Sequence, residues 1–279
     1  MRQLKINGTF SLKHTLECGQ CFRWKKKNDS YIGVVCGKVA RVKESDGKVF
    51  IETEGELCFW ENYFDLNRDY DRILQTFGSH PFTLKAIEYG RGLRILQQDV
   101  WETLCSFILT QRMKIERTAA IIEKLCRAGD EMIEFKGETF FAFPSPKTMA
   151  KFNEETWRVL GAGYREKYLS KAPQSFLTER KFFDEGHCYQ TTSEARKQLI
   201  QSFCGVGKKT ANCVLLFGLR RMDAFPVDTW IEKASKQYYG GKLNVADFGE
   251  YAGIAQQYIF HYVRNEGMNA VSCDCGDGL

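Results

Sequence analysis

The sequence has few of the features that mark membrane-spanning, secreted or disordered chains. No run of about 18 apolar residues occurs in its 279 residues, which excludes a membrane-spanning helix. Proline is scarce, with 5 residues, and 43% of the chain is apolar, so a mostly disordered protein is also excluded. The opening residues, MRQLKINGTF, lack the apolar core of an export signal, and we expect a protein that is not secreted.

Charge and cysteine content exclude less. The 40 Lys and Arg against 35 Asp and Glu leave a formal net charge of +5, which permits a nucleic-acid partner. The 11 cysteines are odd in number and irregularly spaced, which favours reduced thiols. Cys18-x-x-Cys21 has no second pair of the same spacing, and Cys273-x-Cys275 lies in a Gly/Asp tail. We therefore expect no metal and no other cofactor.

The pattern of apolar residues differs between the first and the second part of the chain. Residues 31–36 and 39–42 are rich in β-branched side chains, and alternation resumes at 49–53 beyond Asp46-Gly47, a common hairpin turn. A short helix is expected at 56–64. These patterns predict an N-terminal antiparallel sheet domain over residues 1–88.

From about residue 92 the apolar spacing becomes helical. Asp99 is a good N-cap with Glu102 three residues later, which opens a helix. Further helices are expected at 193–203, 210–219, 227–239 and 248–264. The sequence thus predicts an α+β fold, in which a helical domain over residues 89–270 follows the sheet and residues 271–279 form a flexible tail.

The most informative stretch reads LIQSFCGVGKKTANCVLLFGLRRMDAFPVDTW and covers residues 199–230. Its apolar period breaks at a Gly-Val-Gly turn, which predicts a helix-hairpin-helix at 193–219. Such a turn lets the backbone approach another molecule, and the start of the second helix suits a phosphate. A helical hairpin with an ordinary glycine loop has the same pattern. The candidate phosphate-binding residues are Gly205, Val206, Gly207 and Lys208.

Two residues in this stretch have the chemistry of a catalytic pair. Lys209 falls in the first turn of the second helix, where the positive end of the dipole favours a neutral, nucleophilic amine. Asp228 follows Pro226-Val227 and has the position of a helix N-cap. Taken singly, each also has a structural interpretation, as a solvated charge and a cap; their combination at this spacing is much rarer.

The stretch resembles the helix-hairpin-helix, Gly/Pro-rich loop and aspartate of the HhH-GPD DNA glycosylase superfamily, with the lysine of its bifunctional members. Other patches are similar to the 8-oxoguanine DNA glycosylases, in particular their smaller, mostly prokaryotic branch, and occur in family order: CGQCFRW at 18–24, ILQQD at 95–99, SFI at 106–108, LGAGYR at 160–165 and YAGIAQ at 251–256. The resemblance implies a TBP-like N-terminal sheet. It also implies a monomer that acts on double-stranded DNA containing 8-oxoguanine, without a membrane, in the cytoplasm (nucleoid) of a prokaryote or the nucleus of a eukaryote.

The resemblance also implies roles for individual residues. Lys209 would attack C1′ of a flipped nucleotide and form a Schiff base that permits β-elimination, with Asp228 as its electrostatic and acid-base partner. The carbonyl of Gly19 would accept from the N7–H that 8-oxoguanine has and guanine lacks. The other implied lesion-base contacts are Cys213 and Phe260, which would sandwich the base, and Gln256, which would read its Watson–Crick edge. For Cys213 and Phe260, core packing is the alternative.

On the opposite strand, the chain departs from the eukaryotic pattern. Arg112-Met113-Lys114 stands where that pattern has asparagines that fill the space left by the flipped nucleotide, so we predict a relaxed preference for the opposite base. Trp230 replaces a histidine of that pattern. The residues that match those holding the orphaned base are Arg117, Tyr164 and Arg165.

Two other functions remain open from the sequence. One is a glycosylase for another damaged base, for which Gly19 would have no special role. The other is a non-catalytic helix-hairpin-helix module that only anchors DNA phosphates and forms no Schiff base.

Overall fold

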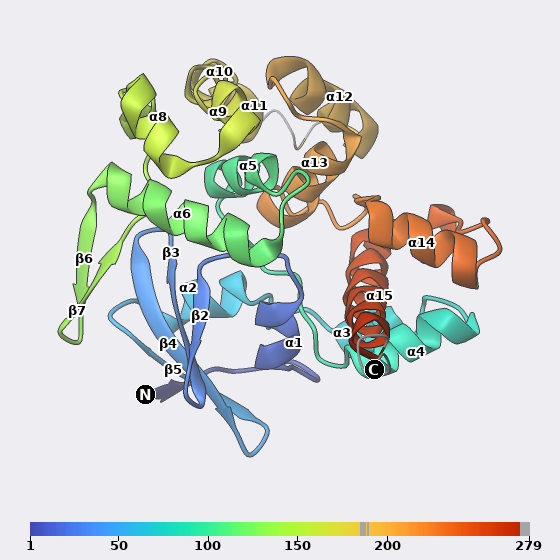
Figure 1. The fold of residues 1–279 in the computed structure, drawn as a ribbon. Coiled ribbons are helices and arrows are strands. Elements are labelled where there is room, and N and C mark those ends of the chain that lie inside the picture. The colour runs from blue at the N-terminus through green and yellow to red at the C-terminus, as the bar shows by residue number, and fades with distance from the viewer. Residues whose placement is uncertain (185–187, 189, 274–279) are drawn as a thin grey trace, which may run out of the picture.

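A five-stranded antiparallel sheet and a body of helices make up the computed structural model, which describes residues 1–184, 188 and 190–273 (Figure 1). The α+β prediction is confirmed. No helix in these described ranges is long and apolar enough to cross a membrane.

The sheet holds the predicted strands in antiparallel register. Tyr31 lies opposite Val42, which lies opposite Ile51. Asp46 and Gly47 form the expected hairpin turn, with φ of 51° and 68°. The strand order is β1 (Arg2–Gln3), β5 (Lys48–Thr53), β4 (Lys38–Ser45), β3 (Ser30–Val35) and β2 (Trp24–Lys27).

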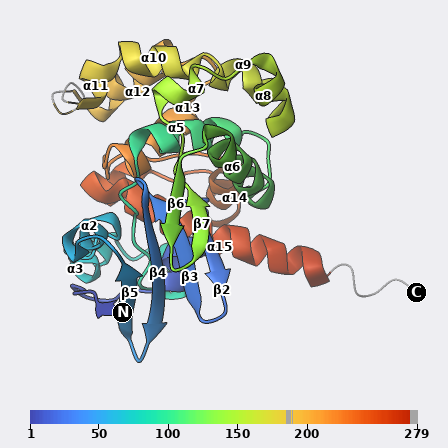
Figure 2. The same ribbon diagram turned by 90° about the vertical axis from the view of Figure 1, so that its left-hand side faces the viewer.

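Both faces of the sheet are buried. One face packs with α1 (Leu12–Glu17) and α2 (Leu57–Tyr63), which supply Leu16 and Trp60 to its core. The other face meets a hairpin that the sequence analysis did not predict, β6 (Met132–Phe135) and β7 (Glu138–Phe141), whose Phe135 packs with Ile32, Val34 and Val39. Figure 2 shows this hairpin crossing in front of the sheet. The helical domain therefore packs against the sheet domain through the β6–β7 hairpin.

The helical body follows the predicted periods, with two local changes. The expected helices at 193–203 and 227–239 are α12 (Thr192–Ser202) and α14 (Thr229–Tyr238). The one expected at 210–219 is α13 (Lys208–Cys213), which continues as a π-helix, η3 (Val214–Gly218). The one expected at 248–264 is a 3₁₀ segment, η4 (Val245–Tyr251), followed by α15 (Ala252–Cys273). Residues 271–273 of the expected tail are thus helical, and 274–279 lie outside the described residues.

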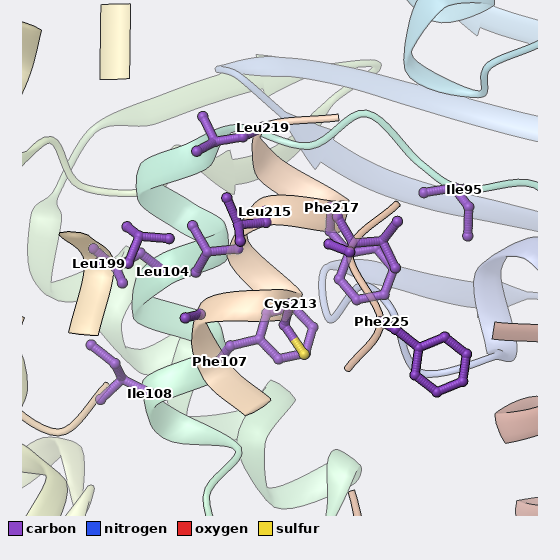
Figure 3. Close-up of a cluster of buried hydrophobic side chains, with 14 of the residues drawn as sticks. Ile95, Leu104, Phe107, Ile108, Leu199, Cys213, Leu215, Phe217, Leu219 and Phe225 are labelled. Atoms are coloured by element: carbon purple, nitrogen blue, oxygen red, sulfur yellow. The ribbon is translucent and has the colours of Figure 1, made fainter. Parts of the chain in front are cut away.

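The remaining helices complete the body around α5 (Val100–Leu109), whose Asp99 N-cap accepts from the backbone N of Glu102 at 2.8 Å as expected. Leu104, Phe107 and Ile108 of α5 join Leu199 and Leu215 in one buried cluster (Figure 3). Helices α3 (Tyr70–Leu74) and α4 (Pro81–Tyr89) add to this helical core although all but the last residue of α4 lie within 1–88. The other helices are α6 (Ile115–Gly129), α7 (Pro146–Met149), α8 (Glu154–Leu160), η1 (Gly163–Arg165), α9 (Glu166–Leu169), α10 (Ala172–Thr178) and α11 (Arg180–Asp184).

An extended segment, residues 92–98, joins the two domains through buried polar contacts. Arg94 is 0% exposed and its guanidinium lies 4.4 Å from the centroid of the Tyr70 ring. Its nitrogens donate to four backbone carbonyls, those of Asn7, Thr9, Asp65 and Arg68. One side chain therefore satisfies carbonyls from the N-terminal arm and from the loop after α2.

We expect Arg94→Met to lower the free energy of unfolding by about 3 kcal/mol or more, because several buried carbonyls lose their donor at once. Urea denaturation followed by circular dichroism measures this loss. Arg91→Met is the matched control: Arg91 is exposed, and its replacement should change stability by no more than about 0.5 kcal/mol. Equal losses in the two variants would contradict this role of Arg94.

Candidate active site

A cavity of about 490 Å³ opens where the α1–β2 loop, the α5–α6 loop, α13 and α15 meet. Its lining contains both predicted catalytic residues and all four residues predicted to bind the lesion base. Polar and apolar groups converge there from both domains, which is the usual character of a ligand site. These six residues are Gly19, Lys209, Cys213, Asp228, Gln256 and Phe260.

Lys209 lies in the first turn of α13, which begins after the exposed Gly207. Its Nζ lies 4.9 Å from the centroid of the Phe107 ring, and that ring stacks on Phe217 at 5.4 Å. Cys213, one turn further along, also contacts the amine. Burial raises the pKa of the Cys213 thiol to about 11, so the thiol is neutral at physiological pH. The Lys209 amine thus lies against the ring of Phe107, and the neutral Cys213 thiol beside it is not a competing nucleophile.

Asp228 is the N-cap that the sequence predicts. Its Oδ1 accepts from the backbone N of Trp230 at 3.1 Å and of Ile231 at 3.0 Å, at the start of α14. Burial raises the pKa of this carboxyl above its ordinary value, against the lowering effect of the two amides and of Lys209. Capping fixes the carboxylate at the cavity wall, facing the same space as the amine.

Gly19 lines the cavity, and its carbonyl differs from those of its two neighbours in having no donor. The carbonyls on either side are occupied: that of Cys18 accepts from Gln257 Nε2 at 3.1 Å, and that of Gln20 accepts from Gln98 Nε2 at 2.7 Å. No described residue donates to the carbonyl of Gly19 itself. Gly19 has φ +85°, and a Cβ there would lie 2.7 Å from Arg264 Nη1, so glycine is required.

Helix α15 lines the cavity with side chains at a spacing of four. Gln256 is 3% exposed, and its Oε1 is buried with no donor. The half-buried ring of Phe260 follows one turn later, and Arg264 one turn after that. A buried amide oxygen without a donor is costly, and it suits a ligand that supplies an N–H.

The α5–α6 loop forms the mouth of the cavity. Arg112, at φ 51°, is exposed, Met113 is half-buried, and both line the opening. Lys114 and Arg117 are exposed at the start of α6 and do not line the cavity.

Two residues after α8, the aromatic Tyr164 and the basic Arg165, support that loop. Tyr164, 47% exposed, donates from its hydroxyl to the carbonyl of Gln111 at 3.3 Å. Arg165 is 6% exposed and donates to the carbonyls of Ala162, at 3.2 Å, and Gln111. In this structure, therefore, Arg165 braces the loop rather than extending toward a partner.

The predicted phosphate-binding turn is a tight helix-hairpin-helix. Gly205 has φ +81°, and a Cβ there would lie 2.4 Å from the Tyr168 ring. The N–H of Val206 donates to the carbonyl of Phe203, and its side chain is buried. Only Gly207 and Lys208 of the four candidates are exposed. Gln111 Nε2 donates to the carbonyl of Gly205 at 2.9 Å, which ties this turn to the mouth of the cavity.

The cysteines near the site are held as thiols. Cys18 and Cys21 are buried and donate to carbonyls of α1, and burial raises the pKa of each. In the described part of the chain, no group of three or more His, Cys, Asp or Glu is arranged to hold a metal ion. Cys275 lies outside the described residues, and the side chain of Cys273 is not described.

Several residues that line the cavity or support its walls were not predicted from the sequence. Phe107 and Phe217 form the stacked pair of rings beside Lys209. Gln98, Gln257 and Arg264 donate hydrogen bonds to backbone carbonyls in and next to the Gly19 loop. The spacing of Gln256, Phe260 and Arg264 at intervals of four is a signal that could have identified the last of these.

Comparison with known proteins agrees with this geometry. Residues 3–104 match the family model "8-oxoguanine DNA glycosylase, N-terminal domain", and residues 105–246 match "HhH-GPD superfamily base excision DNA repair protein". The chain belongs to the HhH-GPD superfamily, among its 8-oxoguanine DNA glycosylases. It is thus a DNA glycosylase/lyase of base excision repair.

Individual relatives cover most of the chain. The structure of MBOgg1 in complex with a low-affinity DNA ligand is 35% identical and has a TM-score of 0.85, covering 96% of this chain and 100% of that one. The Clostridium acetobutylicum 8-oxoguanine glycosylase/lyase, in complex with double-stranded DNA containing cytosine opposite 8-oxoguanine, is 32% identical with a TM-score of 0.84, covering 92% and 93%. A probable N-glycosylase/DNA lyase of Methanothermobacter thermautotrophicus is 28% identical over 237 residues, 75% of each chain.

For Asp228 the structure predicts opposite effects on activity and stability. Because burial raises its pKa, the wild-type excision rate should fall as the pH drops through a value above that of ordinary Asp. Asp228→Asn keeps the N-cap and removes the charge, so it should lose excision yet unfold at a higher temperature at neutral pH. The raised folded pKa makes the ionised carboxylate costly above that pKa, so this advantage should vanish below about pH 4.

Excision assays and thermal unfolding across pH measure both effects. A stability difference that does not change with pH would show that ionisation of Asp228 is not its cause.

Proposed function

We propose that the protein flips 8-oxoguanine out of duplex DNA, excises it through Lys209 and nicks the strand weakly. The observation that supports this most strongly is that Lys209 and Gly19, whose carbonyl accepts from no described residue, line the same cavity of about 490 Å³. One group supplies the nucleophile, and the other supplies an acceptor for the N7–H that distinguishes the lesion from guanine.

In the proposed reaction, the neutral amine of Lys209 attacks C1′ of the flipped nucleotide. The bond from C1′ to N9 breaks, and the base leaves with the bonding electrons and takes up a proton. The nitrogen then loses a proton, the C1′–O4′ bond breaks as O4′ takes up a proton, and the nitrogen lone pair forms the C1′=N bond of a Schiff base. Removal of a proton from C2′ expels the 3′ phosphate by β-elimination. The carboxylate of Asp228, fixed by the amides of α14, stabilises positive charge at the sugar.

Recognition of the base would use the walls of the same cavity. Cys213 and Phe260, which both line the cavity, would sandwich the ring, and the buried Oε1 of Gln256 would accept from an N–H of the Watson–Crick edge. Among the residues of the helix-hairpin-helix turn, the exposed Gly207 and Lys208 would meet a phosphate, while Gly205 and Val206 shape the turn.

The opposite strand would be read with relaxed preference. Arg112 and Met113 at the mouth would fill the space left by the flipped nucleotide, with Lys114, Arg117 and Tyr164 facing solvent beside them. A buried Arg165 would act by bracing their loop. None of Arg112, Met113 and Lys114 is an asparagine, the residue that the eukaryotic pattern has at this place.

The nucleophile can be tested by borohydride trapping on a duplex containing 8-oxoguanine. Wild type should form a covalent adduct with DNA, and Lys209→Gln should form none and lose about a hundredfold or more in excision rate. Lys236→Gln is the matched control, since Lys236 is exposed on α14 and does not line the cavity, and this variant should keep the adduct. Trapping by Lys209→Gln would reject this nucleophile, and no adduct with wild type would favour a binding module or another lesion.

Relaxed pairing can be tested in the same assay with C, T, G or A opposite the lesion. Yields from wild type should agree within about fivefold, because no pair is favoured by more than about 1 kcal/mol. Arg112→Asn should increase the preference for C; asparagine also tolerates the positive φ of this position. Lys114→Asn, outside the cavity, is the control. Strong preference for C in wild type would contradict the proposal.

A further inference from the structure

Arg264 links the two halves of the lesion-base pocket. From α15, its Nη2 donates to the carbonyl of Glu17 at 3.0 Å, two residues before Gly19. Its guanidinium lies 5.8 Å from the centroid of the Phe260 ring, and its Nη1 lies 2.7 Å from the point that a Cβ on Gly19 would occupy. The side chain therefore touches both the loop that carries the free carbonyl and the ring that would stack on the base.

Structural stability alone does not account for this arginine. Its Nε and Nη1 are buried without hydrogen-bond partners, and no carboxylate of the described residues forms an ion pair with it. A guanidinium usually satisfies several donors when it is buried, as Arg94 does, and an unpaired one is costly. Its single hydrogen bond goes to the carbonyl of Glu17, the last residue of α1 and directly before the Gly19 loop, which indicates where the residue acts.

Positioning matters because the proposed discrimination depends on one carbonyl. A hydrogen bond weakens steeply once its length or angle departs from the ordinary range, so the Gly19 oxygen has to be held in place. Glycine at φ +85° does not provide that rigidity by itself. Gln257 and Gln98 fix the carbonyls of Cys18 and Gln20, and Arg264 fixes that of Glu17.

We propose that Arg264 is a positioning residue for lesion recognition, which sets the Gly19 carbonyl at a fixed place relative to the stacking ring of Phe260. This inference rests on the proposed excision of 8-oxoguanine. Loss of the bond to Glu17 frees the carbonyl, so discrimination against guanine falls. Cleavage at an abasic site, where there is no base to recognise, does not depend on Arg264.

The test compares Arg264→Met, Arg264→Lys and wild type, with Asn265→Ala as the matched control. Asn265 neighbours Arg264 on α15, but its Nδ2 donates to the carbonyl of His261 in its own helix. For each protein, two quantities are measured: the ratio of affinities for duplexes containing 8-oxoguanine or guanine, and the rate of strand cleavage at a preformed abasic site.

Arg264→Met should reduce the affinity ratio by up to about tenfold, the size expected for the one neutral hydrogen bond between the base and the Gly19 carbonyl, and leave abasic cleavage unchanged. Arg264→Lys should recover most of the ratio, since an ammonium can still reach the carbonyl of Glu17. Asn265→Ala should behave as wild type.

The proposal is overturned if the ratio of Arg264→Met equals that of wild type, if abasic cleavage falls in parallel with the ratio, or if lysine is no better than methionine. Wild type without any preference for 8-oxoguanine would instead overturn the proposed function itself, and this inference with it.

Discussion

The rest of the site depends on one constraint. Each buried polar group of the extended segment 92–98 needs a hydrogen-bond partner. A connection that runs through the interior carries backbone groups that water cannot reach, so each needs a partner from the protein. The Gln20 side chain bonds the carbonyl of Arg94 and the N–H of Leu96, and Gln98 returns a bond to the carbonyl of Gln20. The backbone N–H of Gln98 also donates to the carbonyl of Phe217, in the π-helix that follows the Lys209 helix. The segment thus fixes the Gly19 loop and the helix that carries Lys209 against each other.

The residues proposed for catalysis and those proposed for recognition come from different parts of the fold. Lys209 lies in the first turn of α13 and Asp228 caps α14, so both belong to the helical body. The Gly19 carbonyl, in contrast, comes from the loop after α1. Using a helix cap as a catalytic carboxylate has a physical advantage, because two amide donors hold its orientation before substrate arrives. It also has a cost, since burial disfavours the ionised form that the reaction needs.

Local patterns predicted the parts of the fold that local forces determine. The Asp46-Gly47 turn and the Asp99 and Asp228 caps follow from backbone preferences within a few residues, and the structure has all three. The β6–β7 hairpin was missed because its turn is Lys136-Gly137, in which lysine adopts φ 53° without the asparagine or aspartate that usually marks such a turn. The burial of Arg165 could not be read from sequence either, since its acceptor is the carbonyl of Gln111, 54 residues away. Such contacts depend on tertiary packing alone.

The proposed contact that distinguishes 8-oxoguanine from guanine is a backbone carbonyl, that of Gly19. Specificity for the lesion therefore depends on the residues that position this carbonyl rather than on the side chain at position 19. Replacing Gly19 would disturb the loop itself, because its φ is positive and its Cα faces Arg264. Side chains that grip neighbouring carbonyls, Gln98, Gln257 and Arg264, are free to vary without that penalty. Two of these three lie on α15, the helix that also carries Gln256 and Phe260, so one helix sets both the stacking ring and the geometry of the acceptor. Changes in the damaged base that such a pocket accepts should therefore arise along α15 before they arise in the glycine loop.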